Sequence, residues 1–160
     1  MHTVDAAYLH LLVNHVPIIL TVIGALAAVL AIVTRRRAIW LYALVSLTLS
    51  GVSAYPVMAT GDAAKDIMKD RWYVTRDALE AHEEAGDFAM WVLLAMGAAS
   101  GYAWWRMVRR EPTGVPPMWL GALVVVMSLA GTAATTVAAY RGGNIVYYSP
   151  KLVSPKTGNR

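Results

Sequence analysis

The sequence has no cysteine and little charge, since Asp, Glu, Lys and Arg make up only 15% of its 160 residues. Without cysteine there is no disulfide, iron–sulfur cluster, covalently attached c-type haem or thiolate zinc site. Any metal centre must therefore use histidine, methionine, carboxylate or backbone ligands. The sequence also has no phosphate-binding loop, no HExxH motif and no nucleophile beside a general base, so we expect no independent catalytic activity.

The net charge of +4 does not indicate a nucleic-acid partner. The basic residues are divided among short links and helix ends, a distribution typical of anchoring beside a membrane. We therefore expect membrane lipid, and no nucleic acid, among the partners.

Long apolar runs fill most of the chain, which is 58% hydrophobic. Each run reaches the roughly 20 residues that a helix needs to cross about 30 Å of hydrocarbon. Because backbone groups in lipid must be paired within their own segment, the sequence predicts an all-α fold, a bundle of four transmembrane helices in a single membrane domain over residues 1–160. The expected helices cover about 6–34, 38–60, 76–108 and 116–141, with an outer loop over 61–75 and a C-terminal tail over 142–160. No basic segment precedes the first run, so we interpret it as a retained helix and not a signal peptide.

Two clusters of arginine predict the orientation of the bundle. One fills the link between the first and second helices and the other closes the third helix: Arg35, Arg36 and Arg37, and Arg106, Arg109 and Arg110. The positive-inside rule places both clusters in the cytoplasm. The N-terminus, the acidic loop between the second and third helices and the C-terminus are then expected outside.

Three histidines, His10, His15 and His82, lie where the first and third apolar runs begin. Imidazoles at the entrance of a lipid-embedded bundle are costly, so they point to a metal, a cofactor or a partner. The two helices run in the same direction, and His10 and His82 precede the arginines at their helix ends by almost the same number of residues, which places them at nearly the same height. His15 lies deeper and on another side of its helix, unless Pro17 bends the segment.

Small residues accompany these histidines. Asn14 continues a small, polar stripe that begins at His10 and should face the bundle, and Gly86 and Ala89 follow His82 on its own helix face. A flat macrocycle lying along a helix would require such a loss of side-chain bulk. The same pattern also serves close helix packing without any cofactor.

A haem b held by two imidazoles from different helices explains these features together. The candidate ligand pairs are His15 with His82, or His10 with His82. The side chains expected to orient the ligands are Asn14, Glu83 and Glu84. The third histidine could then hydrogen-bond a haem propionate or a quinone. The expected function is that of a cytochrome b-like subunit, which relays electrons between a quinol or another membrane redox subunit and an external acceptor such as a soluble electron carrier.

Two other interpretations stand beside this one. In the first, the histidines cap helix ends and the chain is a cofactor-free structural subunit of a larger respiratory or photosynthetic complex. In the second, His10, His15 and His82 hold copper or another metal ion on the outer side, with Met58 as a weaker candidate ligand.

Four ordered sequence blocks resemble an uncharacterised bacterial family of small four-helix predicted membrane proteins. The blocks have the forms H-x4-H-x-P-I, T-G-D-x-A, H-E-E and G-G-x-I-V-Y, and they lie at residues 10–18, 59–64, 80–85 and 142–147. The resemblance covers essentially the whole chain, although Val16 stands where a bulky aromatic residue is common. It implies a four-helix membrane bundle of a family suspected of binding haem through the histidines at His10, His15 and His82, and it supplies no reaction. Together with the positive-inside orientation, it leads us to expect the histidine site near the periplasmic or external face of the bacterial inner membrane.

Overall fold

The computed structural model describes residues 5–110 and 114–147, the last two by their backbone, and every regular element in this part of the chain is a helix. The helices are α1 (Ala6–Val13), α2 (His15–Thr34), α3 (Arg37–Met68), α4 (Arg76–Arg110) and α5 (Met118–Tyr147). Four helical spans are long and apolar enough to cross a membrane, the first formed by α1 and α2 together: Ala6–Thr34, Arg37–Met68, Arg76–Arg110 and Met118–Ile145. The predicted all-α bundle of four membrane-crossing helices is confirmed at this level, and the chain has the character of a multi-pass membrane protein.

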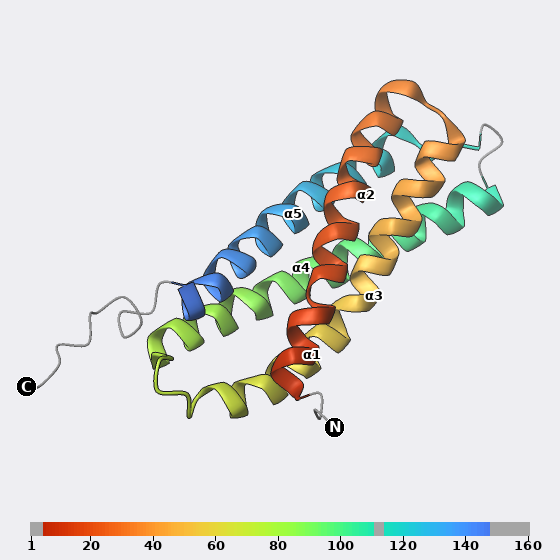
Figure 1. The fold of residues 1–160 in the computed structure, drawn as a ribbon. Coiled ribbons are helices and arrows are strands. Elements are labelled where there is room, and N and C mark those ends of the chain that lie inside the picture. Colours follow the sequence, from red (N-terminus) through yellow and green to blue (C-terminus); the bar gives the residue numbers. More distant parts are fainter. Residues whose placement is uncertain (1–4, 111–113, 148–160) are drawn as a thin grey trace, which may run out of the picture.

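The four spans lie side by side along one long axis (Figure 1). Helix α2 packs against α3 and α5, α4 packs against the same two helices, and α1 packs mainly against α3. Each span therefore packs mainly against two others, and the bundle closes around an interior that includes Leu44, Met96, Leu120 and Val124.

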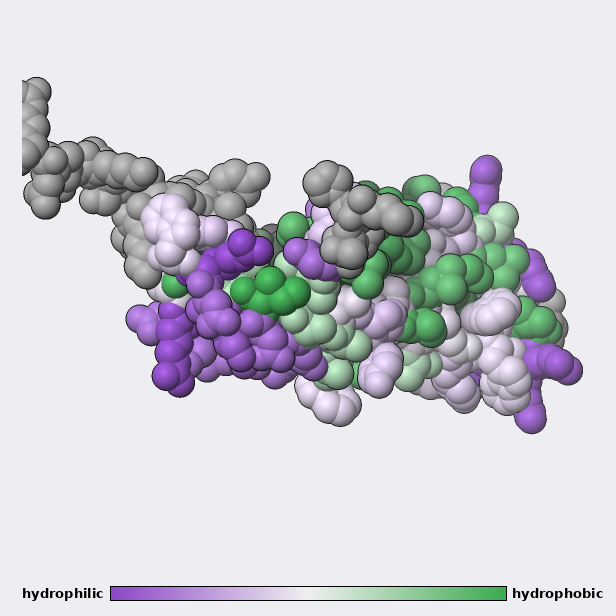
Figure 2. All heavy atoms as spheres, turned by 60° about the horizontal axis from the view of Figure 1, so that its bottom comes forward, coloured by the Kyte–Doolittle hydropathy of each residue, from purple (hydrophilic) through white to green (hydrophobic). Residues whose placement is uncertain are grey.

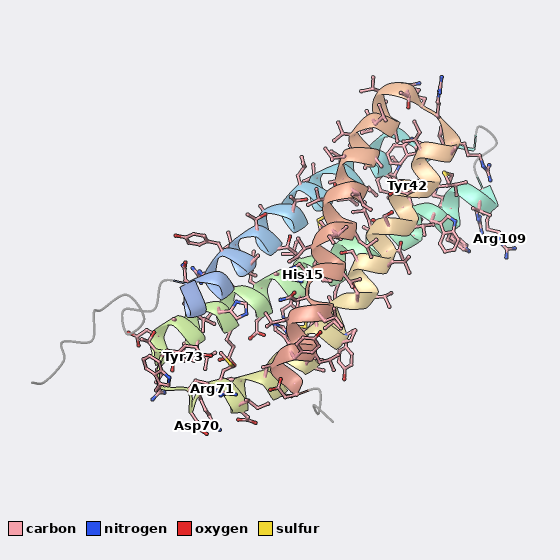
Figure 3. The ribbon with its side chains drawn as sticks, in the orientation of Figure 1. His15, Tyr42, Asp70, Arg71, Tyr73 and Arg109 are labelled. Carbon is pink, nitrogen blue, oxygen red and sulfur yellow. The ribbon has the colours of Figure 1, made fainter. Side chains whose placement is uncertain are left out.

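The surface of the bundle divides along its length. Hydrophilic residues gather towards the two ends on the face drawn in Figure 2, and the middle is largely apolar. Asp70, Arg71 and Tyr73 lie at the end with the α3–α4 link, whereas Arg109 lies at the opposite end (Figure 3). Large apolar side chains are exposed on the sides, as expected of a lipid-facing surface, among them Leu26, Val33, Val52, Trp91 and Val126.

The first span is interrupted at Asn14, which ends α1 and precedes α2. Pro17 follows three residues later and has no N–H to donate to the carbonyl of Val13, so the regular ladder fails at this point. Pro17 is itself buried, and its carbonyl accepts a hydrogen bond of 3.0 Å from Ser50 Oγ on α3. The break therefore lets α1 and α2 direct different sides towards the bundle, although both helices still pack against α3.

Two helices continue beyond the ends expected from the sequence. Helix α3 runs to Met68, past the predicted loop start at 61, and α5 runs through Gly142 and Gly143 to Tyr147. A single glycine inside a helix costs only about 1 kcal/mol relative to alanine, so packing against neighbouring helices outweighs it. Helix α4 starts at Arg76 as predicted, and the hydroxyl of Thr75 accepts a hydrogen bond of 3.4 Å from the Ala78 N–H.

Helices α3 and α4 approach closely at Gly51 and Gly97. A Cβ atom added to Gly51 would lie 2.7 Å from the Cα atom of Gly97 and 2.8 Å from the carbonyl oxygen of Leu93. Such an approach between backbones requires glycine on both sides. Gly97 and Gly51 therefore face each other across this contact.

Candidate functional site

His10 and His82 meet inside one end of the bundle. They come from α1 and α4, and their ring centroids are 6.3 Å apart with an angle of 70° between the ring planes. Both side chains are half-buried. The similar height predicted for these two residues is thus matched by the short distance between their rings.

The His10 ring is fixed by α3. Its Nδ1 atom lies 3.1 Å from the carbonyl oxygen of Val57 and 3.3 Å from Oγ1 of Thr60. A carbonyl oxygen can only accept a hydrogen bond, so Nδ1 carries the proton. In the neutral ring the lone pair is then on Nε2, which is the arrangement of a histidine that binds a metal through Nε2.

The His82 ring is fixed in the same way by α5. Its Nδ1 atom lies 3.0 Å from the carbonyl oxygen of Ala138 and must donate to it. Among the described residues, neither His10 nor His82 has a hydrogen-bond partner at Nε2. Two imidazole lone pairs are therefore available within one end of the bundle.

A glycine lies beside each of the two rings. Gly61 and Gly142 each follow the accepting carbonyl by one helical turn, at Val57 and Ala138 respectively. A Cβ atom added to Gly61 would lie 3.2 Å from Cε1 of His10, and one added to Gly142 would lie 2.9 Å from Cε1 of His82. The missing side chains let each ring approach the helix closely enough to reach the carbonyl.

His15 is placed apart from this pair. Its ring is exposed at the junction of α1 and α2 (Figure 3), and its Nδ1 atom lies 2.8 Å from the carbonyl oxygen of Leu11 in the preceding helical turn. Of the two ligand pairs expected from the sequence, the structure brings together His10 with His82. The break at Asn14 does not turn His15 towards them.

The other candidate residues lie around the histidine pair in different environments. Asn14 is half-buried, and within the described part of the chain its Oδ1 atom is buried without a hydrogen-bond partner. Gly86 is half-buried one turn after His82, and no atom lies within 4 Å of a Cβ added there. Ala89 is only 5% exposed and belongs to the packed interior. Gly86 therefore borders open space, as a cofactor contact requires, whereas Ala89 packs inside the bundle.

The two carboxylates expected to orient the histidines, Glu83 and Glu84, make no hydrogen bond to either ring among the described residues. Glu83 accepts hydrogen bonds of 2.6 and 2.5 Å from Lys65 Nζ, which join α3 to α4 beside the histidine pair. Both side chains are more than one-third exposed, so solvent screens this ion pair and it contributes little to stability. Glu84 is exposed. The rings are oriented by the carbonyl groups of Val57 and Ala138, which hydropathy and spacing did not reveal.

Arg141 also reaches the site from α5. Its Nη1 atom donates a hydrogen bond of 2.9 Å to the carbonyl oxygen of Ala81, the residue before His82. Arg141 directly precedes Gly142, so one turn of α5 supplies the carbonyl, the glycine and the cation around His82.

The histidine pair does not extend into a larger cluster of ligands. In residues 5–110 and 114–147, no group of three or more His, Cys, Asp or Glu side chains could hold a metal ion. Met58, the further candidate for copper, is half-buried in α3 beside Val57. The arrangement suits a cofactor that takes two imidazoles better than an ion that needs three protein ligands.

Comparisons of the chain with protein-family models, with curated proteins and with solved structures gave no match. The functional argument therefore depends on the geometry of the site.

Proposed function

We propose that the protein is a cytochrome b-like membrane subunit that holds one haem b between His10 and His82. The observation that carries the proposal is the pair of imidazoles from different helices, each donating its Nδ1–H to a backbone carbonyl and each with an Nε2 lone pair available. Metal-binding histidines typically have this second hydrogen bond, which fixes the tautomer and the ring orientation.

The spacing of the two rings fits one shared metal. With metal–nitrogen bonds of about 2.0–2.1 Å, imidazoles on opposite sides of one ion have ring centroids about 6 Å apart. The His10 and His82 centroids are 6.3 Å apart.

The surroundings of the pair also fit a large ligand. Gly86 leaves open space on the His82 side of α4, because an added Cβ would meet no atom within 4 Å. The buried Oδ1 atom of Asn14, one helical turn after His10, has no partner in the described chain. A buried acceptor without a partner indicates that a water or a ligand group belongs beside it.

Bound haem would supply a one-electron carrier, and the protein residues would bind it, orient it and limit its contact with water. The donor is a quinol or another membrane redox subunit, and the acceptor lies outside the membrane. The acidic residues near the α3–α4 link provide a surface for a basic soluble carrier, and they include Asp62, Asp66, Asp70, Asp77 and Asp87. The chain then has no catalytic reaction of its own.

The proposal is tested by one spectrum of the purified protein. After expression with ample haem, the reduced-minus-oxidised difference spectrum is expected to show b-type bands, and pyridine extraction is expected to give about one haem per chain. A colourless protein would contradict the proposal and favour a structural subunit. Copper without iron in elemental analysis would favour the metal-ion alternative.

We further propose that the histidine pair lies towards the periplasmic face of the bacterial inner membrane. The arginine clusters mark the opposite end as cytoplasmic by the positive-inside rule. Both termini are then outside the cytoplasm.

The orientation can be tested with single cysteines, because the chain has none. Asp70 and Arg109 are exposed at opposite ends (Figure 3). Asp70→Cys is expected to react with an impermeant maleimide added to spheroplasts, whereas Arg109→Cys should react only after the membrane is permeabilised. The reverse labelling pattern would place the histidine pair on the cytoplasmic side.

A further inference from the structure

Arg141 is a cation beside the histidine pair that has no anionic partner in the described chain. It is half-buried near the end of α5, and the ion pairs of the described residues join Lys65 with Glu83, Lys69 with Asp66 and Arg76 with Glu80. The two acidic residues nearest to Ala81 in sequence, Glu80 and Glu83, are therefore already occupied by other cations.

The contact with Ala81 positions the guanidinium group without satisfying it. Arg141 donates one hydrogen bond through Nη1 to the Ala81 carbonyl, 2.9 Å away. A guanidinium has five N–H donors in a planar fork, which suits a carboxylate held by two parallel bonds. Ala81 precedes His82 and Arg141 precedes Gly142, against which the His82 ring lies, so the backbone positions of Arg141 and His82 are close together.

We infer that Arg141 binds a carboxylate of the ligand held between His10 and His82. On the proposed function, on which this inference rests, that group is a haem propionate. The same turn of α5 then has three roles at one site: the Ala138 carbonyl fixes the imidazole, Gly142 gives it room and Arg141 anchors the acidic edge of the ligand.

The inference is tested by titrating the full-length haem-free protein with iron protoporphyrin IX and with its dimethyl ester, which lacks both carboxylates. Wild type is expected to bind the ester roughly tenfold more weakly, since the ester loses the charge-assisted hydrogen bonds to the guanidinium and partial exposure reduces their effect. In Arg141→Gln the ratio of the two dissociation constants is expected to fall to about one. A merely structural role would weaken both ligands equally and leave the ratio unchanged.

Arg76→Gln is the matched control, because Arg76 is exposed at the same end of the bundle and pairs with Glu80. It should keep the wild-type ratio. Should Arg141→Gln not fold, Arg141→Lys serves in its place and is expected to lower the ratio part of the way. A wild-type protein that binds acid and ester equally, or an Arg141→Gln protein that keeps the full ratio, would overturn this inference alone. A wild-type protein that binds neither ligand would overturn the proposed function with it.

Discussion

His82→Ala and His10→Ala proteins are each expected to lose the b-type spectrum completely. Each substitution removes one of the two nitrogen ligands in the proposed haem site, and the described residues offer no third histidine, cysteine or carboxylate in a group that could replace it. The measurement is haem content per chain after purification from cells supplied with haem. Helical circular dichroism should change little, because both rings are only half-buried at one end of the bundle.

His15→Ala is the matched control for these two proteins. His15 belongs to the same membrane span as His10, but its ring is exposed and bonds to the carbonyl of Leu11 in its own helix. It is expected to retain full haem content and an unchanged spectrum. Loss of haem in His15→Ala with retention in His10→Ala would show that the other ligand pair is used.

The fold and the similar heights of His10 and His82 follow from elementary features of the sequence. Four apolar runs of sufficient length require four helices in a membrane, because no other structure pairs the backbone within each segment. The similar heights of His10 and His82 follow from the distance of each residue from the arginines that end its helix. Both arguments use only helix geometry and the position of charge, so they do not depend on details of packing.

The choice between His10 and His15 could not be made from the sequence. The two residues lie on different sides of an ideal helix, and Pro17 makes the local path unpredictable because it removes one backbone hydrogen bond. The structure places the break at Asn14, and α1 then directs His10 towards α3 and α4. The direction of a bent segment depends on its tertiary contacts, and the spacing of apolar residues in the sequence does not contain this information.

The residues that hold the rings also could not be predicted from the sequence. Val57 and Ala138 contribute only carbonyl groups, which every residue has, so their side chains give no signal. Gly61 and Gly142 lie in two of the four sequence blocks, but a glycine there does not indicate which side chain of another helix it faces. Their role became visible only from the distance between an added Cβ and the imidazole on the adjacent helix.

The two halves of the protein use the same construction. In each half, a histidine near the start of one membrane span donates Nδ1–H to a carbonyl of the returning helix, one turn before a glycine that lies against the ring. The sequence predicts only a coarse similarity of hydropathy between the halves, with a histidine near the start of each. The shared contact explains why each half needs its own glycine at this height, because a side chain there would occupy the space of the ring.

Gly142→Ala is therefore expected to weaken haem binding about 10–100-fold, the usual effect of losing a residue that orients a metal ligand. The new Cβ would lie 2.9 Å from Cε1 and 3.2 Å from Nδ1 of His82, so the ring must move away from the Ala138 carbonyl. Overpacking of this kind costs about 1–3 kcal/mol, more than the 0.5–1 kcal/mol or so that alanine gains over glycine inside a helix. Haem titration and thermal unfolding in detergent measure the two effects separately.

Gly143→Ala provides the opposite case at the next position of α5. No atom lies within 4 Å of a Cβ added to Gly143, so only the gain in helix propensity remains, and this variant should bind haem normally and unfold at a slightly higher temperature. Equal behaviour of the two alanine variants would show that contact between Gly142 and His82 does not control the site. If instead Gly142→Ala alone loses haem while its helical content is unchanged, the position of the His82 ring against α5 determines whether the cofactor binds.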